Sequence, residues 1–255
     1  LVLRPNRLRT DAAGLVGRLE AEGVSAVASP TGAVYVISGP PVRQLAAFRE
    51  GLCQPQDPTA MAVVEFADPQ PGDVVIDLCA APGGKTTHLA ELMNNRGLIL
   101  AVDRDVARLS RVVENCARLG IDIVVTAPLG ELAERVLKLE RVDLILLDAP
   151  CSNSGVLARR PEARYRLSPR HLASLVQAQL ELLRRAAELA GPSTRLVYST
   201  CSIEPAENEN VISQFCAEQP QWRLTRSKLT WPKAAPQPTD WHDGGFVAEL
   251  IRSAD

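Results

Sequence analysis

The chain has 255 residues, of which 46% are hydrophobic and 23% charged, and its formal net charge is -2. This length suffices for one α/β domain with a filled core and a small additional unit. No uncharged apolar stretch approaches the ~18 residues that a membrane-spanning helix needs, so we expect no contact with a membrane. The slightly acidic balance argues against a protein that coats nucleic acid non-specifically, because phosphate contacts require many Lys and Arg side chains.

The six cysteines form no Cys-x-x-Cys pair and no Cys–His spacing typical of zinc sites, so we expect no metal. The first residues do not form a basic and apolar leader peptide, so nothing indicates secretion. We therefore expect a cytoplasmic protein, with its cysteines present as free thiols.

In chain order, residues 1–55 predict a small α/β unit. Leu15, Val16 and Leu19 lie at helical spacing before Gly23, and Val34–Ile37 is typical of a strand. Gly, Gln, Asp and Pro over residues 51–58 mark the expected boundary, which leaves a larger domain over residues 56–255.

The larger domain alternates short apolar runs with longer amphipathic segments. This alternation predicts a doubly wound, mostly parallel sheet of the Rossmann-like kind. Strands are expected over residues 74–78, 98–102, 121–126, 142–147, 195–199 and 245–251, and helices over about 86–93, 105–119, 168–190 and 207–217.

The turn after the first of these strands reads Asp-Leu-Cys-Ala-Ala-Pro-Gly-Gly-Lys-Thr over residues 77–86. Gly83 and Gly84 allow the backbone to approach a ligand closely, and the following helix start offers free N–H groups. Asp103 closes the second strand, where a carboxylate can accept hydrogen bonds from ribose hydroxyls. The patterns GxxxxGK[ST] and GxGxxG both fail here. The turn therefore suits a dinucleotide, a triphosphate or S-adenosylmethionine, and its spacing favours the last only modestly.

Five further segments extend the pattern, namely Leu3–Thr10, Gln56–Pro58, Leu146–Ser152, Val197–Ser202 and Glu204–Val211. Together with the glycine turn, and in this order, they resemble the motifs of the RNA cytosine-5 methyltransferases of the Sun/Fmu type. The resemblance spans nearly the whole chain, and its three long motifs make it specific.

The resemblance implies a class I methyltransferase domain with S-adenosyl-L-methionine as cofactor, and a small N-terminal unit that binds RNA. It implies a structured RNA as partner, with bacterial ribosomal RNA favoured and transfer RNA next, and we expect a monomer. The candidate cofactor-binding residues are Cys79, Ala80, Ala81, Pro82, Gly83, Gly84, Lys85, Asp103, Arg108 and Asp148.

Methylation of cytosine at carbon 5 requires a thiolate that adds at carbon 6, because the aromatic ring is otherwise a poor nucleophile. The resemblance implies that Cys201 is this nucleophile and that Cys151 assists release. DNA cytosine-5 enzymes use a Pro-Cys cysteine instead, so attack by Cys151 is the alternative. Asp148 is positioned to hydrogen-bond the cytosine. Lys85 is expected to contact the active-site loop or the base.

Arginines cluster twice, and either cluster can be a solvated surface or a contact to RNA phosphates. The second cluster follows the Pro-Cys segment and so lies beside the expected active site. The clusters comprise Arg4, Arg7 and Arg9, and Arg159, Arg160, Arg164, Arg166 and Arg170.

The chain departs from the family pattern after its third strand. The aspartate usual there is absent from residues 125–130, and the nearest acidic side chain is that of Glu131. This departure keeps a catalytically idle RNA-binding or ribosome-assembly factor as an alternative, since a fold does not imply activity. A DNA cytosine-5 methyltransferase would carry a sizeable target-recognition insertion, which the sequence does not contain.

Overall fold

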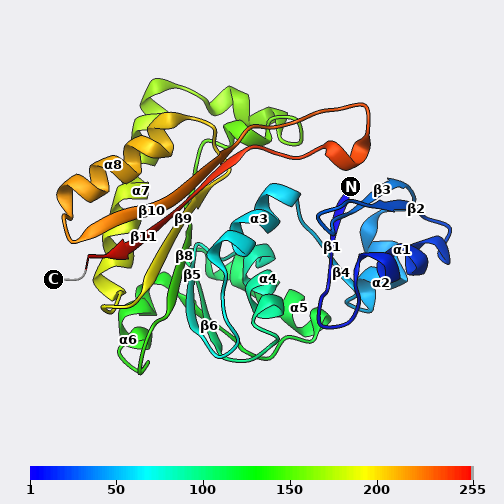
Figure 1. Ribbon diagram of the computed structural model, residues 1–255, viewed down its shortest axis with the longest axis horizontal. Helices are drawn as coiled ribbons and strands as arrows, with labels where there is room; N and C mark the ends of the chain where they lie inside the picture. The colour runs from blue at the N-terminus through cyan, green and yellow to red at the C-terminus, as the bar shows by residue number, and fades with distance from the viewer. Residues whose placement is uncertain (254–255) are drawn as a thin grey trace.

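The computed structural model describes residues 1–253, which form a small antiparallel sheet and a large, mostly parallel sheet (Figure 1). The small sheet has the order β2-β3-β1-β4 and all its pairings are antiparallel. Its elements are β1 (Val2–Pro5), α1 (Ala12–Glu20), β2 (Ser25–Ala28), β3 (Val34–Ser38), α2 (Ala46–Arg49) and β4 (Cys53–Pro55).

The large sheet has seven strands in the order β10-β11-β9-β8-β5-β6-β7. Neighbouring strands from β9 to β7 run parallel, whereas β11 is antiparallel to β9 and β10 is antiparallel to β11. The elements are α3 (Pro58–Ala67), β5 (Val74–Leu78), α4 (Gly84–Leu92), β6 (Leu98–Asp103), α5 (Val106–Leu119), β7 (Val124–Pro128), α6 (Leu132–Val136), β8 (Leu144–Asp148), α7 (Pro169–Leu189), β9 (Arg195–Thr200), α8 (Glu209–Glu218), β10 (Trp222–Thr230) and β11 (Gly245–Arg252).

Two apolar layers cover the large sheet, so the predicted doubly wound architecture is confirmed. One layer packs α3, α4 and α5 against one face, and the other packs α7 and α8 against the opposite face (Figure 1). Buried on both sides, the central strands consist of continuous apolar residues, as parallel strands require. Short 3-10 turns follow the Pro-Cys segment, at Ser154–Val156 (η3) and Pro161–Arg166 (η4), and a third lies between β10 and β11, at Pro238–Asp240 (η6).

Local signals explain where several elements begin and end. Asp57 and Asp105 each accept a hydrogen bond from a backbone N–H in the first turn of the helix that follows them. The helix α5 ends at Gly120, which adopts the left-handed conformation expected of a C-terminal cap. The strand expected over residues 121–126 lies instead at Val124–Pro128, because Ile121 packs against α5 before the chain enters the sheet.

Sequence patterns did not predict β10. This edge strand carries mostly exposed polar residues, so it lacks the apolar run by which a buried strand is recognised. In the small sheet, β1, β2 and β4 have only three or four residues each, too few for a periodicity to be visible.

The prediction that Arg4 belongs to a surface cluster is wrong. Its guanidinium is buried and lies 2.6 Å from the carboxylate of Glu91 on α4. It also donates to Thr87 and to the backbone carbonyl of Gly84, at 3.0 Å and 2.9 Å. Strand β1 of the small sheet is therefore fixed to the first two turns of α4. Within residues 1–253, no helix is both long and apolar enough to cross a bilayer.

Candidate active site

The two cysteines of the predicted active site lie side by side. Cys151 follows β8 and Cys201 follows β9, and these neighbouring parallel strands end at the same edge of the sheet. The two sulfur atoms are 3.2 Å apart, and both cysteines are free and partly buried. Asn153 lies beside them, and its Oδ1 accepts a hydrogen bond from the protonated Cys201 thiol at 3.1 Å. Asn153 was not among the predicted site residues.

Asp148 and Lys85 lie at the same edge. The Lys85 Nζ is 2.7 Å from one carboxylate oxygen of Asp148, and the Ser199 hydroxyl donates to the other at 2.9 Å. Burial alone would lower the pKa of Lys85, but the charge and hydrogen bond of Asp148 outweigh it and raise the pKa. The predicted residues Cys151, Cys201, Asp148 and Lys85 are thus assembled in one place, and Ser199 is a further member of the group.

The pKa values of the two thiols are shifted in opposite directions. A hydrogen bond from Cys151 stabilises the thiolate of Cys201 and lowers its pKa, with Lys85 and Arg160 adding to the effect against burial and Asp148. The same pairing, together with burial, raises the pKa of Cys151 well above the ordinary value. Among the paired thiols, Cys201 is therefore the better candidate for a nucleophile. Burial raises the pKa of Cys79 to about 12, which agrees with a packing role for that side chain.

A buried acidic segment holds both cysteine loops. The carboxylate of Glu207 accepts hydrogen bonds from the backbone N–H and hydroxyl of Ser152, next to Cys151. Gln179 of α7 donates to the same carboxylate at 3.0 Å. The adjacent Asn208 binds the Thr200 hydroxyl at 2.6 Å and, through its amide, the backbone carbonyl of Ser202 at 3.0 Å. The segment Glu204–Val211, which the sequence singled out without a role, thus fixes the position of each thiol.

The glycine turn is shaped by close approach to α5. Gly83 has φ +97°, and a Cβ there would meet the backbone of Val112 at 3.1 Å, so only glycine fits. Gly83 also begins α4 without any side-chain cap, which leaves the first N–H groups of α4 available to a ligand.

Two predicted cofactor residues bind the turn itself. Asp103 accepts hydrogen bonds from the backbone N–H groups of Ala81 and Asp105, at 3.1 Å and 2.9 Å. Arg108 donates to the Ala81 carbonyl at 2.6 Å. Both side chains thus set the conformation of the segment that comprises Cys79, Ala80, Ala81 and Pro82.

Asp77, at the start of this turn, was not predicted as a site residue. Its carboxyl group is fully buried at the end of β5, where one oxygen accepts from the Thr86 hydroxyl at 2.6 Å. The other oxygen, Oδ1, has no partner among the described residues. Burial raises the pKa of Asp77 to about 7, and the nearby Asp148 adds to the shift. A buried carboxylate oxygen without a partner is uncommon, and this one lies at the start of the predicted cofactor turn.

At the third strand, the usual acidic residue has no substitute. The Glu131 carboxylate lies 2.9 Å from Arg135 within the same helical segment, and both side chains are about half exposed. Glu131 is therefore engaged locally with Arg135 and does not take the place of the missing aspartate.

The arginines of the second cluster, residues 159–170, fall into two groups, one ion-paired and one exposed. Arg159 is 2.8 Å from Asp57 and also binds Asp243, so it joins the segment after Cys151 to the start of α3 and of β11. Arg160, Arg164, Arg166 and Arg170 are exposed. Their exposure and their place after the Pro-Cys segment leave them free to contact phosphates. Within residues 1–253, no group of three or more His, Cys, Asp and Glu side chains is placed to hold a metal ion.

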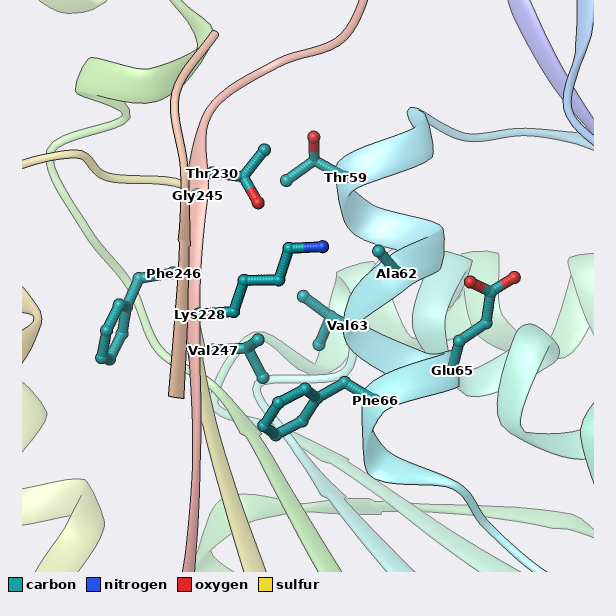
Figure 2. A pocket seen from close by; sticks show the side chains of 10 residues that line it. All are labelled: Thr59, Ala62, Val63, Glu65, Phe66, Lys228, Thr230, Gly245, Phe246 and Val247. Carbon is teal, nitrogen blue, oxygen red and sulfur yellow. The ribbon is translucent and has the colours of Figure 1, made fainter. Parts of the chain in front are cut away.

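A separate hollow of about 290 Å³ lies between α3 and the β10–β11 hairpin, and contains none of the predicted site residues. Figure 2 shows the Lys228 ammonium extending towards Ala62 of α3, with Thr59, Thr230 and Gly245 at one end and Phe66 at the other. The end formed by Gly245 adjoins the backbone of Cys201.

Comparison with known proteins identifies the family of the chain. Residues 64–248 match the family described as 16S rRNA methyltransferase RsmB/F. The chain is 39% identical over 225 residues to a probable ribosomal RNA small subunit methyltransferase B from Synechocystis, covering 83% of this chain and 50% of the relative. It is 38% identical over 256 residues to the corresponding protein of Salmonella agona, covering 98% and 59%.

Among solved structures, a methyltransferase homologue from Pyrococcus horikoshii superposes with a TM-score of 0.79 at 31% identity, over 99% of this chain and 86% of that one. The chain spans about half the length of the curated relatives it matches. The family match covers more than half of the chain, and the paired cysteines lie within it. The chain therefore belongs to the RsmB/F family of 16S rRNA methyltransferases.

Proposed function

We propose that this chain transfers a methyl group from S-adenosyl-L-methionine to carbon 5 of a cytosine in small-subunit ribosomal RNA. The observation that carries the proposal is the pair of thiols, 3.2 Å apart, beside the Lys85–Asp148 ion pair. The substrate class follows the curated relatives, which are named as ribosomal RNA small subunit methyltransferases.

The glycine turn fits the cofactor. The uncapped start of α4, the carboxylate of Asp103 and the unpartnered Oδ1 of Asp77 offer donors and acceptors for an amino acid and a ribose. Bound there, S-adenosyl-L-methionine supplies an electrophilic methyl group. Because the usual aspartate after the third strand is missing, backbone and apolar groups at the end of β7 would have to hold the adenine.

The reaction uses Cys201 as the nucleophile. Its thiolate forms a bond to carbon 6 of the cytosine, which makes carbon 5 electron-rich and able to attack the methyl group. Asp148, held in place by Lys85 and Ser199, accepts a hydrogen bond from the cytosine amino group. The proton on carbon 5 then passes to solvent, and its bonding electrons restore the 5,6 double bond and expel the Cys201 thiolate from carbon 6. Cys151, whose high pKa keeps it protonated beside the leaving sulfur, stabilises the departing thiolate by donating a hydrogen bond to it.

The roles of the two thiols can be separated by trapping the covalent adduct on transcribed small-subunit ribosomal RNA in the presence of cofactor. Cys151→Ala is expected to attack the RNA and fail to release it, which gives a protein–RNA band that survives denaturant. Cys201→Ala and the double variant are expected to give no such band, because the attacking thiol is gone.

Bisulfite sequencing of the same RNA locates the methylated cytosine. A band with Cys201→Ala and none with Cys151→Ala would reverse the two roles. Two active variants that trap nothing would rule out covalent catalysis, and binding of RNA without any methyl transfer by the native chain would indicate an idle assembly factor.

A further inference from the structure

Two of the three tryptophans of the chain are exposed on one loop. Trp231 and Trp241 are 62% and 51% exposed and lie in the segment between β10 and β11, whereas Trp222 is buried. We call residues 231–244 the tryptophan loop. Two large aromatic side chains exposed on one loop are a candidate interaction surface.

The tryptophan loop begins and ends beside the thiols. Thr230 pairs with Gly245, and a Cβ on Gly245 would lie 2.8 Å from the carbonyl oxygen of Thr200 and 3.7 Å from Cys201. Gly244 donates its N–H to the Gly155 carbonyl at 2.7 Å, and Gly155 donates to that of Cys201 at 3.0 Å. Through these contacts the loop is anchored directly on the backbone that carries the nucleophile.

The tryptophan loop is also held at its far end. The Tyr35 hydroxyl of the small sheet donates to the carbonyl oxygen of Trp241 at 2.8 Å, and Lys233 and His242 pair as a short bridge. The indole N–H of Trp241 binds the Ala235 carbonyl within the loop. The polar group of this ring is therefore satisfied internally while half of its surface remains exposed, so the ring is presented in a fixed orientation. Figure 1 shows the loop spanning from the large sheet to the small one.

The tryptophan loop is tied to a chain segment that carries exposed arginines. Arg159 ties the segment after Cys151 to Asp243 of the loop, and the next residue, Arg160, is exposed. Arg164 and Arg166 follow in η4 and are also exposed. Arg160 is close enough for its charge to favour the thiolate of Cys201. An exposed aromatic surface next to the exposed Arg160 is complementary to an RNA strand, and less so to an apolar protein partner.

We infer that the tryptophan loop is a stacking surface for unpaired bases that flank the target cytosine. The inference rests on the proposed function, and it adds the class of RNA that this site accepts. The reacting base has to leave its stack to reach Cys201, and its neighbours then lose a stacking partner. Exposed indole rings replace that partner for any base, whereas a paired duplex offers no free base face. The site therefore selects single-stranded loops or junctions.

Binding of two fluorescein-labelled RNAs tests the inference without requiring methyl transfer. One is a hairpin with an unpaired, cytosine-containing loop, and the other is the matching fully paired duplex. Trp231→Ala and Trp241→Ala are each expected to weaken binding of the hairpin about 5- to 100-fold, the range typical of one stacked base. Binding of the duplex is expected to stay unchanged, and the corresponding Phe variants are expected to restore most of the hairpin affinity.

Leu137→Ala is the matched control, because this side chain is 86% exposed on the α6 side of the sheet and faces no part of the loop. Cofactor affinity and the melting temperature are measured for every variant. Unchanged hairpin binding in the folded double Ala variant would overturn the inference, as would equal losses for hairpin and duplex. Normal hairpin binding by a native chain that transfers no methyl group would instead refute the proposed activity, while leaving the stacking surface in place.

Discussion

The sulfur atoms of Cys151 and Cys201 lie 3.2 Å apart, although fifty positions separate the two residues in the chain. Their proximity follows from the pairing of β8 with β9, which places Asp148 opposite Ser199 at the ends of adjacent parallel strands. The contact lowers the pKa of one thiol and raises that of the other, so the two cysteines are chemically distinct before any substrate binds.

This asymmetry predicts how Cys201 reacts with iodoacetamide. Because its pKa is lowered below the ordinary 9.0, the rate of alkylation is expected to rise with pH earlier than for a free thiol. Cys151→Ala removes the hydrogen bond that contributes most, so the profile moves to higher pH and the rate near pH 7.5 falls severalfold. Cys151→Ser keeps a donor and is expected to retain most of the rate. Mass spectrometry of the labelled peptide measures the alkylation rate of Cys201 at each pH. Identical pH profiles for the Ala and Ser variants would show that the hydrogen bond from Cys151 does not lower the pKa of Cys201.

Asp103 is expected to support the cofactor more than the fold. Asp103→Ala removes the acceptor for the N–H groups of Ala81 and Asp105, so the turn loosens and a ribose contact is lost. A loss of about tenfold or more in cofactor affinity is expected, in line with hydrogen bonds to charged groups. Calorimetric titration measures the affinity, and circular dichroism verifies the fold. Asp143→Ala, at the start of β8 and away from the turn, provides a control for the loss of a carboxylate. A cofactor affinity of Asp103→Ala equal to that of the native chain would exclude Asp103 from the site.

The carboxyl group of Asp77 is expected to lower the free energy of unfolding at neutral pH and to support cofactor binding. In the folded chain its pKa is about 7, against an ordinary 3.8, so the folded state keeps a proton that the unfolded state releases between these values. Its contribution to the free energy of unfolding is therefore lost as pH rises from about 4 to about 7 and is constant above that range.

The variant Asp77→Asn removes this dependence of the free energy of unfolding on pH. An increase of up to about 4 kcal/mol in the free energy of unfolding is expected at pH 8, together with weaker cofactor binding, because the free Oδ1 is replaced. Urea titrations across pH 4–8, set beside the native chain, provide the measurement. Parallel curves for the two proteins would show that Asp77 is ionised throughout.

Arg4 is expected to be essential for stability. Arg4→Ala leaves the buried Glu91 carboxylate without its cation, and breaking such a pair costs about 3–5 kcal/mol. The double variant Arg4→Met/Glu91→Leu replaces both charges with apolar groups and is expected to regain much of the loss. Thermal melts of the single and double variants measure the difference. A double variant no more stable than Arg4→Ala would show that packing, and not the unpaired charge, dominates.

Much of the fold could be predicted from the sequence because its signals are local. Apolar runs, the cap at Gly120 and the positions of Asp148, Cys151 and Cys201 at strand ends all follow from neighbouring residues. The burial of Arg4 could not be predicted, since it depends on Glu91, which lies 87 positions away. The contacts of Asn153 and Glu207 are likewise tertiary. The tryptophan loop could not be predicted, because the edge strand before it carries no apolar pattern.

Near the thiols, three separate segments meet through their backbones. A Cβ on Gly155 would lie 2.6 Å from the carbonyl oxygen of Gly244 and 2.8 Å from that of Cys201, so no side chain fits between them. The separation of these segments is therefore set by the thickness of the polypeptide itself, and not by the size of any interposed residue. Substitutions that repack the apolar layers beneath the sheet can accumulate without altering the spacing of these three backbones. The support of the Cys201 backbone is thus insulated from sequence drift in the core.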